Sequence, residues 1–74
     1  MQNRFMCPHR KVEFSIGQRC HWFEYSHDQI IVDGGNGTII EFLKEPFGFI
    51  IILCDDGKLR QIYSMDIDPD IEEV

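Results

Sequence analysis

The sequence has no long hydrophobic run, few basic residues and only three cysteines. No stretch approaches the ~18 to 20 consecutive apolar residues that a membrane-spanning helix needs, so no such span is expected. The first residues lead into no apolar run with a small-residue cleavage site, so we expect no signal peptide. An odd number of cysteines without dense spacing is typical of free thiols in a reducing compartment. These absences together predict a cytoplasmic protein.

The chain is also short, because 74 residues allow one small domain and leave no room for a second. Hydrophobic side chains make up 43% of it, which is too many for a disordered chain. The 7 Lys+Arg against 13 Asp+Glu give a formal net charge of −6. Four of the seven basic residues lie in the first twenty positions, so the acidity belongs to the remainder of the chain. Such acidity opposes nucleic-acid phosphate as the main ligand.

Short stretches of alternating or β-branched residues predict strands, and no window has a convincing helical stripe. Val12, Phe14 and Ile16 alternate with polar residues at the period of two that is typical of a half-buried strand. Further strands are expected over 18–25, 38–42, 49–54 and 58–63, with a brief apolar run at 30–32 and a single tight turn at 64–66. This pattern predicts an all-β meander of about five antiparallel strands.

Glycine marks the expected turns. Residues 33–37, Asp-Gly-Gly-Asn-Gly, are the strongest turn signal in the chain, and we expect the backbone to reverse or bulge there. Further turns are expected at 44–48 and at 55–57, where an Asp-Gly pair favours a tight hairpin. A phosphate-binding loop is not expected, because Gly37 leads into a strand and such loops open a helix.

The strand at 49–54, Phe-Ile-Ile-Ile-Leu-Cys, is apolar on both of its faces. An antiparallel strand with one face in water would alternate instead. Either the sheet curls into a small barrel, with the Phe5-Met6 arm lying across the outside, or a second copy covers the strand. The second option predicts a homodimer through residues 49–54.

The order of these cues resembles the small SH3-like barrels of the KOW and Tudor type. The resemblance is at the level of fold and is carried by residues 14–20, 32–41, 49–57 and 64–69. It implies a five-stranded antiparallel SH3-like barrel at 12–69. Residues 1–11 contain Pro8 and have no apolar periodicity, so we expect an irregular N-terminal arm there, and residues 70–74 form a short acidic tail. Proteins of this class bind peptides, modified arginine or lysine, nucleic acid or other proteins, so the fold alone selects none of these.

Cysteine and histidine residues suggest a metal only weakly. The chain lacks the paired spacing of a tetrahedral site, and the adjacent Cys20 and His21 point to opposite faces of a strand. A shared site of Cys7, His9 and His27 stays open beside the alternative that these side chains are packed or face solvent. We therefore expect no metal and no cofactor. No Cys-His pair with an orienting group is apparent, so we expect no catalytic residues and no enzyme.

Aromatic residues are the most informative feature for function. In SH3-like barrels, aromatic residues beside the loops form peptide grooves or cages for cationic side chains. By that resemblance the candidate partner-binding residues are aromatic or acidic, namely Trp22, Phe23, Tyr25, Phe47, Tyr63, Glu24 and Asp28. The alternative is that the aromatic side chains form the core. The leading hypothesis is a non-enzymatic interaction module that binds a protein or a cationic peptide.

Two other functions remain as alternatives. The first is a KOW-like nucleic-acid-associated domain that uses the basic residues Arg4, Arg10, Lys11 and Arg19. The second is a small metal-binding protein.

Overall fold

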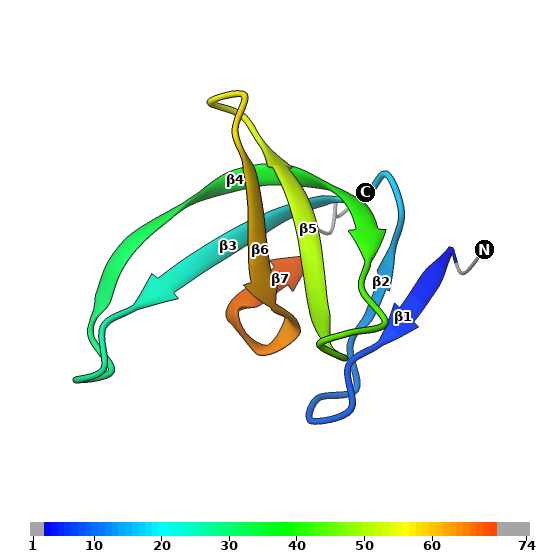
Figure 1. The fold of residues 1–74 in the computed structure, drawn as a ribbon, viewed down its shortest axis with the longest axis horizontal. Coiled ribbons are helices and arrows are strands. Elements are labelled where there is room, and N and C mark those ends of the chain that lie inside the picture. Colours follow the sequence, from blue (N-terminus) through cyan, green and yellow to red (C-terminus); the bar gives the residue numbers. More distant parts are fainter. Residues whose placement is uncertain (1–2, 70–74) are drawn as a thin grey trace, which may run out of the picture.

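The computed structural model describes residues 3–69 and is built from antiparallel strands (Figure 1). A two-stranded sheet pairs β1 with β2, and a five-stranded sheet has the order β6-β5-β4-β3-β7. The elements are β1 Arg4–Met6, β2 Glu13–Ser15, β3 Arg19–Tyr25, β4 Ile31–Phe42, β5 Phe49–Cys54, β6 Leu59–Tyr63, the 3₁₀ turn η1 Ser64–Asp66 and β7 Ile67–Pro69. The all-β prediction is confirmed, and within residues 3–69 no helix is long and apolar enough to cross a bilayer.

The five-stranded sheet curls around the core, and β4 arches over the other strands (Figure 1). Burial alternates along β5: Ile50 and Ile52 are fully buried, whereas Leu53 is 43% exposed. The curled sheet therefore gives the apolar strand an inner and an outer face without a second copy. The homodimer stays a prediction. The sheet does not close into a barrel, because its edge strands β6 and β7 do not pair with each other.

The N-terminal arm is not irregular throughout, and this expectation was wrong for residues 4–6. β1 pairs with β2 in the register Phe5 opposite Phe14, and both rings are buried. Phe5 thus enters the core and does not lie across the outside of the sheet. A strand of three residues is too short to show a periodic pattern, and its pairing with β2 cannot be read from the arm alone.

Arg10 fastens the loop between β1 and β2 to the end of the chain. Its guanidinium donates to the Asp68 carboxylate at 3.0 Å, to the Ser64 carbonyl at 2.8 Å and to the Ile67 carbonyl. These bonds join the hairpin to η1 and β7, so the small sheet and the large sheet enclose one core.

The glycine cluster is not a turn, and this prediction was wrong. β4 runs through it without interruption, and the register shifts lie elsewhere, at Glu24/Tyr25 and Ile39/Glu41. The glycines instead permit close packing: a Cβ on Gly37 would lie 2.4 Å from Cγ2 of Ile52. The chain reverses at residues 26–29, where Gln29 has a φ of 64° and donates its N–H to the Ser26 carbonyl.

The other expected turns are confirmed. Gly57 has a φ of 88° in the β5–β6 hairpin, and its N–H donates to the Cys54 carbonyl at 2.9 Å. A turn at 44–48 joins β4 to β5, and the tight turn at 64–66 is η1. The acidic tail at 70–74 lies outside the described residues.

Candidate functional site

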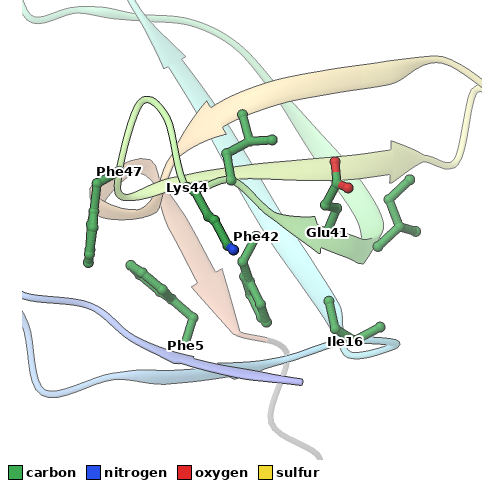
Figure 2. Close-up of a pocket in the computed structure, with 8 residues that line it drawn as sticks. Phe5, Ile16, Glu41, Phe42, Lys44 and Phe47 are labelled. Carbon is green, nitrogen blue, oxygen red and sulfur yellow. The ribbon is translucent and has the colours of Figure 1, made fainter. Parts of the chain in front are cut away.

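An apolar groove of about 880 Å³ lies between β1, the C-terminal end of β4 and the loop that follows β4 (Figure 2). Its lining is mostly apolar and consists of Phe5, Ile16, Ile40, Glu41, Phe42, Leu43, Lys44 and Phe47. The groove is open on one side, and within residues 3–69 its charged lining residues are Glu41 and Lys44. We call this feature the phenylalanine groove.

Three phenylalanine rings shape the groove. Phe5 stacks on Phe42 with ring centroids 5.6 Å apart and meets the tilted ring of Phe47 at 5.4 Å. Phe5 is buried and Phe42 is half-buried, so both are anchored in the core. Phe47 is 61% exposed although it is large and apolar. The groove thus has a fixed floor and one exposed aromatic side chain at its edge.

The register shift in β4 adds an aliphatic wall. Between Ile39 and Glu41 the pairing with β5 slips by one residue, which is the sign of a β-bulge. Ile39 is consequently fully buried, whereas its neighbour Ile40 is 41% exposed and lines the groove. Ile16 contributes a further exposed aliphatic side chain.

A second, smaller hollow of about 230 Å³ lies beside the indole of Trp22, and we call it the tryptophan hollow. It is lined by residues from β3, β4, β5, β6 and the β5–β6 turn: Trp22, Asp33, Gly34, Gly35, Asn36, Cys54, Asp55, Asp56 and Arg60. The guanidinium carbon of Arg60 lies 4.4 Å from the centroid of the indole ring, which is cation-π geometry. The same guanidinium lies 4.0 Å from carboxylate oxygens of Asp33 and Asp56.

Asp55 lines the same hollow but is engaged by Arg19. Both carboxylate oxygens of Asp55 accept hydrogen bonds from Arg19, each at 2.7 Å. These bonds from Arg19 hold the pKa of the Asp55 carboxyl below its ordinary value. The charge of Asp55 is therefore balanced locally.

The predicted partner-binding residues do not gather in one place. The C-terminal part of β3 contains Phe23, Glu24 and Tyr25, and Asp28 lies in the turn that follows. Trp22 is 3% exposed and belongs to the core as well as to the tryptophan hollow.

The other two predicted aromatic residues lie outside β3 and the β3–β4 turn. Phe47 is in the phenylalanine groove, while Tyr63 packs against Phe49 and His9 at centroid distances of 5.0 and 6.2 Å. Sequence reasoning missed Phe5, Phe42 and Ile40 as groove residues. Phe5 and Phe42 are aromatic, and this property could have marked them as candidates in the sequence. The bulge that exposes Ile40 has no recognisable sequence pattern.

Most of the basic residues proposed for nucleic-acid contact have acidic neighbours. Arg10 pairs with Asp68 and Arg19 with Asp55, and Arg4 lies 3.8 Å from Glu13. Lys11 is exposed. No single observation on the described residues favours the nucleic-acid alternative.

The residues considered for a metal are dispersed. In residues 3–69, no group of three or more His, Cys, Asp or Glu side chains is arranged to hold an ion. His27 lies in the β3–β4 turn, whereas Cys7 follows β1 at the other end of the molecule (Figure 1).

All three cysteines are buried. Burial of the Cys7 thiol raises its pKa, but hydrogen bonds from Ser64 and from the backbone at His9 and Arg10 outweigh burial and leave the pKa below its ordinary value. Burial raises the pKa of the Cys54 thiol. Cys20 lies near the Gly37 carbonyl, at 3.7 Å. The three thiols thus occupy separate positions in the core.

Comparison with known proteins identifies no relative: no protein-family model, no curated protein and no solved structure matches this chain.

Proposed function

We propose that the chain is a non-enzymatic protein-interaction module that binds a partner protein in the phenylalanine groove. The observation that carries the proposal is Phe47, a large aromatic side chain that is 61% exposed above an apolar groove. Exposed apolar surface around a concave site commonly marks an interaction surface. Aromatic side chains in such places often supply much of the binding free energy.

The partner is a short apolar segment of another protein. The groove is open on one side, so a side chain bound in it can stay attached to a longer polypeptide. An extended segment can place an aliphatic or aromatic side chain against Phe5 and Phe42 and leave its backbone in water. Glu41 and Lys44 provide polar contacts for that backbone.

The proposed fold family is that of the small SH3-like barrels, in an open form. The curled antiparallel five-stranded sheet and the 3₁₀ turn before the last strand support this assignment. Such barrels bind ligands beside their loops, and the phenylalanine groove adjoins the loop at 43–48. We also propose that the protein is cytoplasmic.

Substitution of Phe47 tests the function. The probes are peptides selected from a random library for binding to the intact chain, and we expect them to carry apolar side chains. Phe47→Lys is expected to weaken their binding by at least about tenfold, because the loss of a hot-spot side chain costs on the order of 2 kcal/mol or more. Leu59→Lys is the matched control, because Leu59 is 63% exposed and lies outside the groove. Equal binding by the wild type and Phe47→Lys would contradict the proposal.

A further inference from the structure

The indole N–H of Trp22 is a buried donor without an acceptor among the described residues. Trp22 is 3% exposed, so water satisfies this group poorly. Nε of Arg60 is also buried and unpartnered, and both residues line the tryptophan hollow. Buried donors without partners are uncommon and cost free energy, so each one calls for an explanation. Neither nitrogen is accessible while the Arg60 guanidinium lies on the indole, so a ligand oxygen would satisfy them only after the Arg60 side chain has moved.

Gly35 lets the indole of Trp22 pack closely against β4. A Cβ on Gly35 would lie 3.2 Å from Nε1 of Trp22 and 3.1 Å from Cζ2. Any other residue at position 35 would place a side chain against the indole. Trp22 and Gly35 both line the hollow.

Two carboxylates that line the hollow can each accept further hydrogen bonds. One oxygen of Asp33 accepts the Gly34 N–H at 2.8 Å, and one oxygen of Asp56 accepts the Lys58 N–H at 2.9 Å. The second oxygen of each lies 4.0 Å from Arg60, which is too far for a direct hydrogen bond. Since Arg19 balances Asp55, two carboxylates face one guanidinium, and the described residues give the hollow a net charge of −1.

We propose that the tryptophan hollow binds an α-amino carbonyl unit, in which an ammonium group lies close to a carbonyl or carboxylate oxygen. The ammonium group lies between Asp33 and Asp56, which it reaches by charge-assisted hydrogen bonds. The neighbouring oxygen accepts the N–H of Trp22, and Arg60 turns from the indole face toward it. A hollow of about 230 Å³ is smaller than typical drug-binding pockets and suits a unit of this size.

Free amino acids and the N-termini of polypeptides share this chemistry. The probes that separate them are L-alanine, which has a carboxylate, and L-alaninamide, which has the amide carbonyl of a chain terminus. N-Acetyl-L-alanine lacks the ammonium group, and ethylamine lacks the oxygen acceptor. These last two are the matched negative probes.

The experiment is a titration of the intact chain followed by the indole N–H resonance and by fluorescence, because the chain has a single tryptophan. L-Alanine, L-alaninamide or both are expected to shift the indole resonance saturably, with N-acetyl-L-alanine and ethylamine at least about tenfold weaker. Tighter binding of L-alanine identifies free amino acids, and tighter binding of L-alaninamide identifies chain N-termini. No saturable shift with either probe, or equal binding of all four, would overturn the proposal.

Variants connect the shift to the hollow. Asp33→Asn and Asp56→Asn are each expected to weaken binding by about tenfold or more, because each removes one charged partner of the ammonium group. Asp28→Asn, an exposed acid in the β3–β4 turn outside the hollow, is expected to bind like the wild type. Unchanged binding in both hollow variants would contradict the proposal.

The site is independent of the phenylalanine groove. Phe47→Lys is expected to bind these probes as the wild type does, because Phe47 does not line the tryptophan hollow. Failure of the peptide-binding proposal and failure of this one are thus seen in separate measurements.

Discussion

Gly35 lies directly opposite Trp22 in the pairing of β3 with β4, and a Cβ at position 35 would approach Cζ2 of the indole to 3.1 Å. The glycine thereby allows the largest side chain of the protein to lie flat against the inner face of the sheet. Two positions further, Gly37 allows β5 to pack closely in the same way. A Cβ at position 37 would lie 2.4 Å from Cγ2 of Ile52. Glycine in this strand provides room for packing.

Alanine substitutions in this strand are expected to follow the size of these clashes. Gly35→Ala is expected to lower the free energy of unfolding by about 1–3 kcal/mol, the usual cost of overpacking. Gly37→Ala is expected to cost more, because the Leu53 carbonyl oxygen, a backbone atom, would also lie 2.7 Å away. Asn36→Ala, at an exposed position between them, is the control and is expected to change stability little. Urea unfolding measures all three, and equal midpoints for the two glycine variants and the control would contradict this account.

Arg10 is expected to stabilise the protein by holding the β1–β2 loop to η1 and β7. Arg10→Lys keeps the charge but cannot span the Asp68 carboxylate and the two carbonyls, so we expect a loss of about 1–3 kcal/mol. Arg4→Lys is the control, because Arg4 is exposed and its oxygen partner on Glu13 is 3.8 Å away. A loss in the control as large as that in Arg10→Lys, measured by urea unfolding, would show that the hydrogen bonds are not the cause.

Asp66 is expected to weaken the fold at neutral pH. Burial raises the pKa of its carboxyl above the ordinary value, and the positive charge of Arg10 offsets this only in part. Because the folded state binds the proton more tightly, stability falls as pH rises from the unfolded pKa, near 4, through the raised folded pKa. Asp66→Asn is therefore expected to be more stable than the wild type at pH 7 and to lose that advantage below about pH 4. Thermal unfolding across this range tests the sign.

Asp55 is expected to show the opposite dependence. Its pKa is held low by hydrogen bonds from Arg19, so its contribution to stability is present above the unfolded pKa and is lost as pH falls through the folded pKa. Asp55→Asn is expected to be slightly less stable than the wild type at neutral pH, and the difference is expected to vanish in acid. The effect is small because the ion pair is exposed. A difference that grew on acidification would contradict the assignment.

Local patterns in the sequence were sufficient for much of the fold. Alternation in residues 12–16 and the Asp-Gly pair at 56–57 each depend on near neighbours, and the predicted strand and hairpin were found. The glycine cluster at 34–37 misled because glycine serves both turns and close packing, and only the positions of Trp22 and Ile52 decide between them.

The candidate sites were harder to predict because distant segments form them. Phe47 was identified as a candidate, but its neighbour Phe5 comes from a three-residue strand whose partner lies in β2. Trp22 lies on β3 and Arg60 on β6, and β4 and β5 lie between these two strands in the sheet. The Arg60 side chain reaches the indole because the sheet curls. Nothing near either residue in the sequence signals this contact.

The central claim is that the phenylalanine groove binds an apolar segment of a partner protein. Its most direct test is a map of backbone amide resonances on addition of a library-selected apolar peptide. We expect the largest shifts at residues 40–47 and at Phe5. Little change is expected at the exposed Tyr25 and residues 30–32, which lie where β3 ends and β4 begins and which we call the β3–β4 ribbon. Shifts concentrated on that ribbon, with the groove unaffected, would contradict the claim.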